Sequence, residues 1–500
     1  MVDKEQNITK SISYLNLAAQ SPSLELNLSL SEKIHQQDSK GKHIIFMCDR
    51  ALLSCSVNVL NKKSICNLCR HKAKEGYKVF QKRNKNSELV KISRKDLLSS
   101  KKSNLSEQTK KEILFGVHST IGSQLRLDNM DLLDKRWKKI EGDMLKSSIS
   151  LFHYFNNYFE QNKIKNFIIF NGRLSCARPL IQSSIKNNVN YFLFDAAING
   201  KVPMYSMNEM FHSISFEKRN ALKTYVKFFK ESRALAQDYM NYKINKIEVN
   251  DFAYTKNQKS KFLAESIINK QKPIISIFTS SDDEYRFIGS DWAKYGIVDQ
   301  IETINKLVNS KLKDKYDFIV KMHPNQHNIH KSIKKRYKYL SKFVTVIPPE
   351  DLTDTYELIL QSEIVVNFCS SVGIESNYLR KPVIQIGPSR FREFPAANYV
   401  NHADEAISII KNKQYKIMPI RASILWFTYQ MKSSFELPSY KYHKDGLFSY
   451  GKEFIRAPFI LRFISVFDKI HFNLIKGDLS FLKNIKLYFL NLILGTTKVK

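Results

Sequence analysis

Short apolar runs alternate with amphipathic segments throughout the second half of the chain. Runs of strand length stop at turn-forming residues in KPIISIFTS (272–280), YDFIVKMHP (316–324), FVTVIPP (343–349), EIVVNF (363–368) and KPVIQIG (381–387). Apolar residues three and four positions apart predict helices between these strands, for example over DQIETINKLVNSKL and DTYELILQS. Buried strands that alternate with helices at this spacing are typical of a parallel, doubly wound sheet.

The first half shows the same pattern with longer polar intervals. HIIFMC (43–48), NFIIFN (166–171) and YFLFD (191–195) predict strands, RPLIQSSIKNN predicts a helix between the last two, and helical periodicity extends over about 130–162. This β-α-β pattern predicts a second parallel sheet. The chain is therefore expected to be an α/β protein of two Rossmann-like domains that face each other across a cleft. Ligands of such sheets bind at the carboxyl ends of the strands.

Composition suggests where the domains begin and end. Residues 1–40 are polar and predict a loose leader, and an N-terminal domain is expected over 41–250. The Lys- and Ser-rich stretch 80–112 predicts a basic insertion or mobile loop within it. The second Rossmann-like domain is expected over 251–430, and a basic, amphipathic helical segment over 431–500.

The net charge of +33 favours an anionic partner, which is nucleic acid, an acidic membrane surface or a phosphorylated substrate. The lysines are dispersed and aromatic-rich RNA-binding signatures are absent, so we expect no specific nucleic-acid partner. No apolar signal-peptide core opens the chain and no run of eighteen apolar residues occurs, so we expect neither a secretory signal nor a spanning helix. Six cysteines in so long a chain fit a reducing cytoplasm.

The last fifty residues contain APFILRFISVF and FLKNIKLYFLNLILG, which mix aromatic and aliphatic residues with Lys and Arg. Two interpretations remain open. Such helices either lie on an anionic leaflet, with the protein peripheral to the inner membrane, or pack back on the first domain.

The stretch KMHPNQH (321–327) ends a predicted strand with His-Pro. Pro324 turns the chain away from the sheet, and an imidazole at His323 would then point toward a ligand at the strand ends. It could hydrogen-bond a phosphate or a leaving oxygen. The alternative is a histidine that caps a surface loop.

A second candidate group follows the predicted strand EIVVN. Ser370 and Ser371 precede a predicted helix, and their hydroxyls and free backbone N–H groups favour an anion. Glu375 lies one turn into that helix, where it could hold a ribose hydroxyl. The alternatives are an ordinary Ser N-cap and charge compensation in the first turn.

The motifs KMHPN, DTYELILQSEIVVNFCSSVGIES and LRKPVIQIG together resemble the donor-binding half of bacterial GT-B glycosyltransferases of surface polysaccharides. Capsule polysaccharide biosynthesis proteins, the Kdo and sialic-acid polymerising transferases, and the teichoic-acid glycerophosphotransferases carry similar elements. The resemblance covers roughly residues 270–390. It implies a GT-B-like fold in which His323, Ser370 and Ser371 bind the donor phosphate, Glu375 contacts the nucleotide, and Pro324 belongs to the same donor-binding loop.

The resemblance leaves the catalytic base open. The acidic base motif of the polysialyltransferases is not evident in the first half of this chain. Asp283 and Glu284, in the acidic loop that follows the first strand of the second half, are candidate catalytic residues, and a solvated turn is the alternative. No clear DxD motif is present, which agrees with an enzyme that requires no cofactor.

The first half offers candidates for the acceptor side in FNGRLSCARP. Asn171, Gly172 and Arg173 end a predicted strand, and Gly172 permits a turn with close ligand approach. Arg173 or Arg178 could pair with an acceptor phosphate or carboxylate. Asp195 ends the next predicted strand as a candidate general base, or it caps the helix that follows.

Four cysteines offer thiolates for a tetrahedral, structural zinc site: Cys48, Cys55, Cys66 and Cys69. The outer spacing is irregular, and Cys48 ends an apolar strand where a buried free thiol is common. Both interpretations stay open.

These features predict a cytoplasmic, membrane-peripheral glycosyltransferase that moves a sugar from a nucleotide donor, with CMP favoured, to a polysaccharide or lipid-linked acceptor. A CDP-glycerol-type glycerophosphotransferase would use the same site. A non-catalytic, zinc-stapled nucleic-acid-binding protein is a third alternative.

Overall fold

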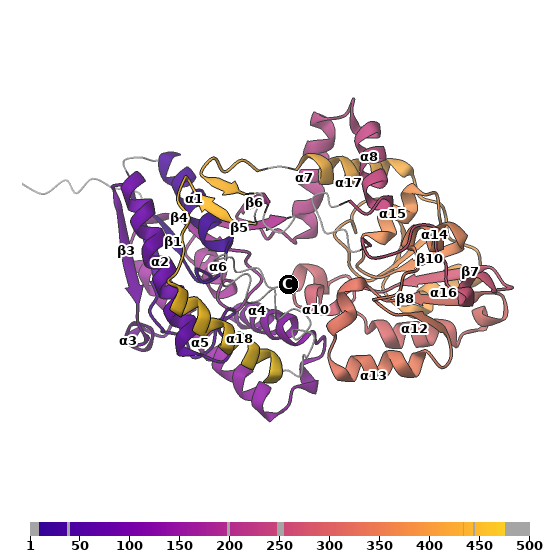
Figure 1. Ribbon diagram of the computed structural model, residues 1–500, viewed down its shortest axis with the longest axis horizontal. Helices are drawn as coiled ribbons and strands as arrows, with labels where there is room; N and C mark the ends of the chain where they lie inside the picture. Colours follow the sequence, from indigo (N-terminus) through magenta and orange to yellow (C-terminus); the bar gives the residue numbers. More distant parts are fainter. Residues whose placement is uncertain are drawn as a thin grey trace, which may run out of the picture. The chain divides into compact units, whose positions relative to one another are not determined.

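The structure is a computed structural model that describes residues 10–37, 41–197, 201–247, 255–433, 435–443 and 446–475. The chain forms two compact units (Figure 1). The first contains the described residues within 1–121, 129–211 and 434–500, and the second contains 122–128 and 212–433. Residues 212–247 belong to the second unit, so the predicted domain junction near residue 250 is wrong: the chain enters the second unit after residue 211. Residues 476–500, the last part of the predicted C-terminal segment, lie outside the described residues.

The elements of the first unit are, in chain order, β1 (Lys10–Tyr14), α1 (Ser23–Gln37), β2 (Lys42–Cys48), α2 (Lys63–Arg83), β3 (Ser87–Ile92), α3 (Arg94–Ser99), α4 (Glu107–Leu125, whose last turn belongs to the second unit), a 3-10 turn (Met130–Leu132), α5 (Lys135–Gln161), β4 (Ile164–Phe170), α6 (Arg178–Lys186), β5 (Asn190–Ala197), β6 (Val202–Met207), β13 (Tyr440–Tyr442), β14 (Phe448–Tyr450) and α18 (Phe459–Ile475).

The first sheet has the strand order β3-β2-β1-β4-β5-β6. All neighbours are parallel except β5 and β6, which form an antiparallel hairpin. The first five strands follow the order 3-2-1-4-5 of a Rossmann fold, with the topological switch between β1 and β4. Because β5 continues into the hairpin, Asp195 lies within a strand and pairs with Met204. The prediction that Asp195 ends a strand or caps a helix is therefore wrong.

The prediction of a loose leader over residues 1–40 is wrong for the described part. The segment KSISY is the central strand β1, between β2 and β4. Its serines are tolerated there because neighbouring strands supply partners: His43 Nε2 lies 3.3 Å from Ser13 Oγ, and Asn166 Nδ2 donates to Ser11 Oγ at 3.2 Å. Local polarity predicted a loop, but paired polar groups carry little penalty on burial.

The predicted insertion over 80–112 is also regular structure. It contains the end of α2, the edge strand β3, and α3, which begins with a capping box between Ser93 and Asp96. Strand β3 lacks a long apolar run because it is an edge strand: Ile92 is buried, and its other residues are partly or fully exposed.

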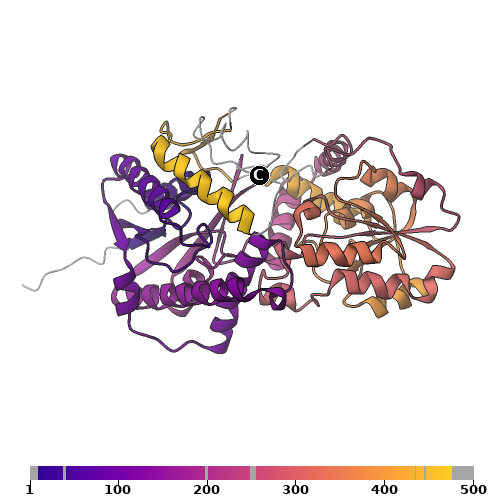
Figure 2. The same ribbon diagram turned by 60° about the horizontal axis from the view of Figure 1, so that its bottom comes forward.

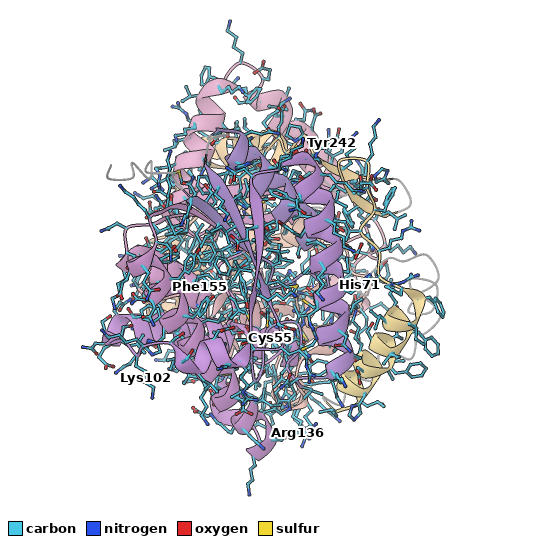
Figure 3. All side chains as sticks on the ribbon, turned by 90° about the vertical axis from the view of Figure 1, so that its left-hand side faces the viewer. Cys55, His71, Lys102, Arg136, Phe155 and Tyr242 are labelled. Carbon is cyan, nitrogen blue, oxygen red and sulfur yellow. The ribbon has the colours of Figure 1, made fainter. Side chains whose placement is uncertain are left out.

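Two helical layers cover the first sheet. Helices α1 and α2 pack on Ile45 and Met47, while Phe155 of α5 contacts Tyr14, Phe46 and Phe167 on the opposite face. Successive residues of β2 thus serve opposite faces, as the two-residue period of a strand requires. Figure 3 shows Phe155 inside this unit and the charged Lys102 and Arg136 at its periphery.

The C-terminal segment belongs to the first unit. Tyr440 and Phe448 of the β13–β14 hairpin join the cluster of α1, and Tyr450 and Ile455 join that of α2. Helix α18 then runs against α2 (Figure 2). Helix α18 confirms an amphipathic helix in this segment and the alternative in which it packs on the first domain. The helical prediction is wrong over 440–450, where β13 and β14 form an antiparallel hairpin. No helix among the described residues is long and apolar enough to cross a membrane.

The elements of the second unit are α7 (Ile214–Lys227), α8 (Ser232–Ile244), α9 (Glu265–Ile268), β7 (Ile274–Phe278), α10 (Asp282–Tyr285), α11 (Ser290–Ala293), α12 (Gln300–Val308), a 3-10 turn (Lys311–Asp314), β8 (Asp317–Lys321), a 3-10 turn (Pro324–Asn328), α13 (Lys331–Leu340), β9 (Thr345–Ile347), α14 (Thr355–Gln361), β10 (Ser362–Asn367), α15 (Val372–Tyr378), β11 (Val383–Ile386), β12 (Asn398–Val400), α16 (Ala403–Lys411) and α17 (Ile420–Lys432).

The second sheet has the order β12-β11-β10-β7-β8-β9, and every neighbouring pair is parallel. Read from the other edge, this is the complete Rossmann order 3-2-1-4-5-6, with the switch between β7 and β10. Figure 1 shows α12 and α13 on the opposite side of this sheet from α15 and α17. The predicted strands all form, and the predicted α/β class with two Rossmann-like domains is confirmed. The cleft stays a prediction.

Candidate functional site

The candidate site of the second unit lies where β7, β8 and β10 end. In a Rossmann sheet the ligand lies outside the carboxyl ends of the strands at the switch point, which here falls between β7 and β10. The loop that contains Ser370 and Ser371 follows β10, and the loop that contains His323 follows β8 on the other side of β7. The two predicted donor-binding stretches therefore lie at the carboxyl edge of the sheet, on either side of β7.

The His323 loop is fastened to the end of β7. The His323 N–H donates to Thr279 Oγ1 at 3.0 Å and to Gln326 Oε1 at 2.9 Å, and Thr279 Oγ1 donates to Gln326 Oε1 at 2.6 Å. Pro324 opens the 3-10 turn that follows, with its fixed φ suited to that position. The loop conformation is thus set before any ligand binds.

The His323 ring has a defined tautomer. Its Nδ1 accepts a hydrogen bond from the Asn325 N–H at 3.1 Å, so the neutral ring carries its hydrogen on Nε2. Burial lowers the pKa of His323; the Glu284 carboxylate opposes this shift and Arg126 adds to it. The ring is therefore neutral at pH 7, with Nε2–H as a hydrogen-bond donor. The capping alternative is also correct, because Nδ1 caps the turn while Nε2 remains the donor.

Arg126 binds the acidic loop. Its guanidinium donates to Asp283 Oδ2 at 2.9 Å and Glu284 Oε1 at 3.3 Å, and Asn325 also hydrogen-bonds Glu284. Asp283 is buried, so the alternative of a solvated turn is wrong for that residue. Arg126 could not be predicted from the sequence, because it lies 157 positions from Asp283 on a segment with no motif of its own. Its charge offsets that of the two candidate catalytic carboxylates.

Asp282, the first residue of the predicted acidic loop 282–284, has a strongly perturbed carboxyl. Burial, together with the nearby Asp128 carboxylate, raises the pKa of Asp282 to about 8. Hydrogen bonds from Tyr285 and Gln300 oppose this shift without cancelling it. Gln300 also receives the Ser280 N–H at 2.9 Å and so ties α12 to the end of β7.

Asn367, the last residue of β10, hydrogen-bonds the backbone of the Ser370–Ser371 loop. The buried Asn367 amide donates to Ser370 O at 2.8 Å and to Gln385 Oε1 of β11 at 2.6 Å. Gly373 lies against it: a Cβ at this position would stand 2.7 Å from Asn367 Nδ2. The Asn367–Gln385 hydrogen bond could not be predicted from the sequence, because both residues stand within otherwise apolar strands.

The two serines of this loop differ. Ser370 Oγ accepts from the Val372 N–H at 3.3 Å, as a capping serine does, whereas Ser371 makes no side-chain cap. Helix α15 has only seven residues, so its dipole adds little. The hydroxyls and N–H groups of the loop stay the predicted anion ligands. Cys369, between the strand and the serines, packs against Tyr285 and Trp292.

Glu375 is buried behind this loop. Its Oε2 accepts a hydrogen bond from the hydroxyl of Tyr356 in α14 at 3.1 Å. The contact with a nucleotide stays a prediction. Exposed first-turn charge compensation, the alternative, does not describe a side chain that is 2% exposed.

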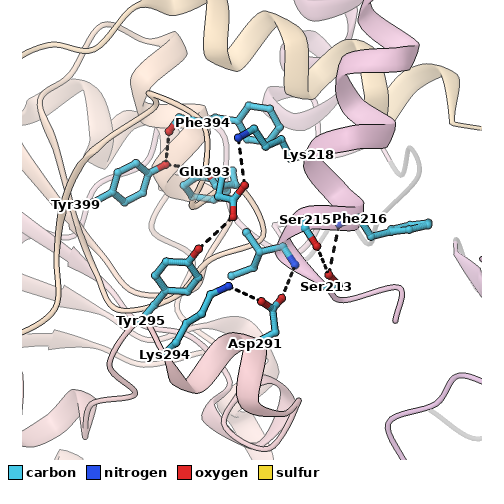
Figure 4. A network of polar contacts seen from close by, with 12 residues as sticks. Ser213, Ser215, Phe216, Lys218, Asp291, Lys294, Tyr295, Glu393, Phe394 and Tyr399 are labelled. Atoms are coloured by element: carbon cyan, nitrogen blue, oxygen red, sulfur yellow. Dashed lines mark hydrogen bonds and ion pairs between the residues drawn. The ribbon is translucent and has the colours of Figure 1, made fainter. Parts of the chain in front are cut away.

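A second polar network joins α7 to the loops beyond β11 (Figure 4). The Ile214 N–H donates to Asp291 Oδ2 at 3.0 Å, Tyr295 donates to Glu393 Oε1 at 3.2 Å, and Lys218 pairs with Glu393 Oε2 at 3.2 Å. These contacts connect α7 both to α11 and to the β11–β12 loop.

In the first unit, Asn171, Gly172 and Arg173 follow β4 at the switch point of its sheet, as predicted. Asn171 hydrogen-bonds Asp195, and its Oδ1 accepts the Arg173 N–H at 3.1 Å. Burial raises the pKa of Asp195, while the N–H of Ala196, the amide of Asn171 and the charge of Arg173 lower it.

Gly172 has a structural reason to be glycine. Its φ is +84°, and a Cβ there would lie 2.7–2.8 Å from Leu193, Ile181 and Met210. The backbone conformation and close packing both require glycine, independently of any ligand.

Arg178 is not placed for an acceptor. It is 4% exposed, and its guanidinium donates to Glu112 Oε2 of α4 at 3.0 Å. The prediction that Arg178 binds an acceptor anion is therefore wrong in this structure, because a buried carboxylate already neutralises its charge.

The cysteines do not fit the predicted zinc site. All are free thiols, and the described part of the chain holds no group of three or more His, Cys, Asp or Glu side chains that could hold a metal ion. Cys55 is partly buried, and its sulfur accepts the Asn58 N–H at 3.3 Å. Cys66 and Cys69 stand on the long helix α2, and Cys69 packs into its apolar cluster. Cys48, Cys55, Cys66 and Cys69 are therefore free, partly buried thiols in this structure.

No protein-family model matches the chain, and no curated protein matches it. Among solved structures, the KpsC beta Kdo 2,4 transferase of Thermosulfurimonas dismutans aligns at 12% identity and a TM-score of 0.34, over 53% of this chain and 79% of that one. The UDP-GlcNAc 2-epimerase of Neisseria meningitidis bound to UDP-GlcNAc aligns at 10% identity and a TM-score of 0.24, over 85% and 96% of the two chains.

MurG of Acinetobacter baumannii aligns at 8% identity and a TM-score of 0.23, over 85% of this chain and 95% of that one. Sequence identities and TM-scores this low support no inference about the substrate or reaction of this protein. The assignment of two Rossmann-type domains rests on the strand orders themselves.

Proposed function

We propose that this protein is a glycosyltransferase of bacterial surface-polysaccharide assembly that uses a nucleotide-activated sugar. The observation that carries the proposal is the neutral His323 ring, held with Nε2–H as donor at the strand edge that also presents Ser370 and Ser371. The motif resemblance of residues 270–390 supports a donor phosphate as their ligand. A CMP-linked donor is the favoured form.

In the proposed reaction, an acceptor hydroxyl oxygen bonds to the anomeric carbon while the bond from that carbon to the donor phosphate oxygen breaks. His323 Nε2–H, the two serine hydroxyls and the loop N–H groups stabilise the charge that develops on the leaving phosphate. The hydroxyl proton passes to a carboxylate base. The candidates for this base are Asp195, whose pKa is raised by burial, and Asp283 and Glu284, which pair with Arg126.

We also propose peripheral association with an anionic membrane through α18. Phe459, Ile460, Ile464, Phe467 and Leu474 recur at helical spacing, each 44–58% exposed. An exposed apolar stripe on a helix of a strongly basic chain fits a helix that lies in a membrane interface. A lipid-linked or polysaccharide acceptor would be met at such a surface.

The donor site is tested by measuring how CMP-, CDP-, UDP- and GDP-linked donors, including CDP-glycerol, bind to the wild type, His323→Ala and Ser371→Ala. Binding is measured by thermal shift and by isothermal titration calorimetry. We expect one nucleotide to bind and each substitution to weaken it at least about tenfold, which is the loss of one charge-assisted hydrogen bond. The matched control is His327→Ala, because His327 is an exposed histidine of the same turn.

Preference for CDP-glycerol would replace the sugar-transfer proposal by glycerophosphate transfer at the same site. Equal binding by wild type and both site variants would remove the phosphate roles of His323 and Ser371. Tight, salt-sensitive oligonucleotide binding with no nucleotide-donor affinity would favour the nucleic-acid-binding alternative.

A further inference from the structure

An apolar groove of about 760 Å³ lies in the second unit between α7 and α17. Tyr225, Phe394 and Leu425 form its buried floor, and Leu222, Val226 and Phe229 form its rim. This volume and lining are those of a binding pocket for a small apolar ligand. The residues of the donor site do not line it.

The rim is unusually exposed for its composition. Val226 is 74%, Phe229 57% and Leu222 41% exposed, and they follow one another at positions i, i+4 and i+7 along α7 and the turn after it. Single exposed apolar residues are ordinary, but a row of three beside a concave apolar floor indicates a ligand-binding surface. The ligand must be largely apolar where it meets this row.

The charge around the groove is positive. Arg421 is the charged residue among those that line it, and its guanidinium lies over the Tyr225 ring at 5.8 Å. Residues 218–233 include six basic residues and one acidic residue. Arg219 lies three positions before Leu222 on the same face of α7, and Lys230 follows Phe229 in the turn after this helix. A ligand with an apolar chain and an anionic end matches both properties.

We propose that this groove binds one hydrocarbon chain of an anionic membrane lipid, with the chain along the floor and the phosphate head at Arg421. A second copy of the chain fits less well, since it would bring another strongly basic surface to a basic rim. The inference is independent of the donor chemistry, because it concerns residues that take no part in the donor site.

The experiment uses the full chain and two single-chain probes below the concentrations at which they aggregate: 1-oleoyl lysophosphatidate and zwitterionic 1-oleoyl lysophosphatidylcholine. We expect wild type to bind the first at least about tenfold more tightly, the effect of one ion pair at the mouth of the groove. Arg421→Gln should abolish that preference, and Val226→Glu should weaken both probes. Val226 is exposed enough that this substitution leaves the fold intact, which circular dichroism verifies.

Two controls locate the binding. Leu360→Glu adds the same charge at an exposed leucine of α14 outside the groove, and Phe467→Glu alters the exposed face of α18; both should bind like wild type. Equal effects of Val226→Glu and Leu360→Glu, or no effect of Arg421→Gln on the phosphate preference, would overturn the proposal. So would a wild-type dimer that Val226→Glu dissociates, because the groove would then hold a second copy.

Discussion

At the scale of single residues, Asp282 makes folding depend on pH. Its pKa is about 8 in the folded chain, against an ordinary value near 4 in the unfolded chain. Between these values the unfolded state releases the proton and the folded state keeps it. The contribution of Asp282 is therefore fully present below about pH 4 and is lost as the pH rises toward 8.

Asp282→Asn should remove this dependence while its amide oxygen still accepts from Tyr285 and Gln300. Relative to wild type, the free energy of unfolding of the variant should rise between pH 5 and 8, by at most about 1.4 kcal/mol per pH unit. Urea denaturation at several pH values measures it. Asp314→Asn, at an exposed aspartate, is the control. Parallel curves for Asp282→Asn and wild type would show that this carboxyl is ionised throughout.

At the scale of elements, the C-terminal hairpin completes the core of the first unit. Tyr450 is fully buried, and its ring stacks on that of Phe80 with the two ring centroids 6.3 Å apart. The Arg83 guanidinium carbon lies 5.4 Å from the centroid of the Tyr450 ring. The hairpin therefore acts as part of the N-terminal fold although more than 350 residues separate Tyr450 from its partner Asn84 in sequence.

Tyr450→Ala should lower the free energy of unfolding by about 3 kcal/mol, as removal of a buried aromatic ring does. Hydrogen exchange should accelerate in α1, α2 and β2, and not in β7 or β8. Tyr339→Ala, at a tyrosine that is 57% exposed, should change stability by less than about 0.5 kcal/mol. If the loss of protection were uniform over both units, the hairpin would not belong to the first core alone.

At the scale of the whole molecule, the charge of +33 and the exposed face of α18 act together. Basic residues draw the chain to an anionic surface, and apolar side chains then insert into it. Neither property alone distinguishes a membrane from other polyanions.

The protein should therefore sediment with phosphatidylglycerol vesicles and not with phosphatidylcholine vesicles, and the bound fraction should fall as salt rises from about 0.1 to 0.5 M. Phe467→Glu should reduce binding more than Tyr339→Glu, which changes the net charge equally at an exposed aromatic residue away from α18. Equal losses in both variants would mean that charge alone holds the protein on the vesicle.

The sequence by itself determined the parallel α/β architecture of the second unit. The strands predicted there are largely apolar runs, because both faces of a central parallel strand are buried, and such runs can be read locally. The short edge strand β12 (NYV) has no such run and was not predicted. The positions of His323, Ser370 and Ser371 followed from the same reading, since each comes directly after a predicted strand and parallel strands end at one edge.

Only the tertiary structure decided the rest. Strand β1 is polar and central because Ser11 and Ser13 find partners on neighbouring strands, and Arg178 is unavailable because Glu112 neutralises it. Arg126 reaches the acidic loop from a distant segment. Hydrophobic periodicity shows which face of each helix or strand is buried. Which polar groups pair depends instead on contacts between segments far apart in the chain, and these exist only once both sheets have formed.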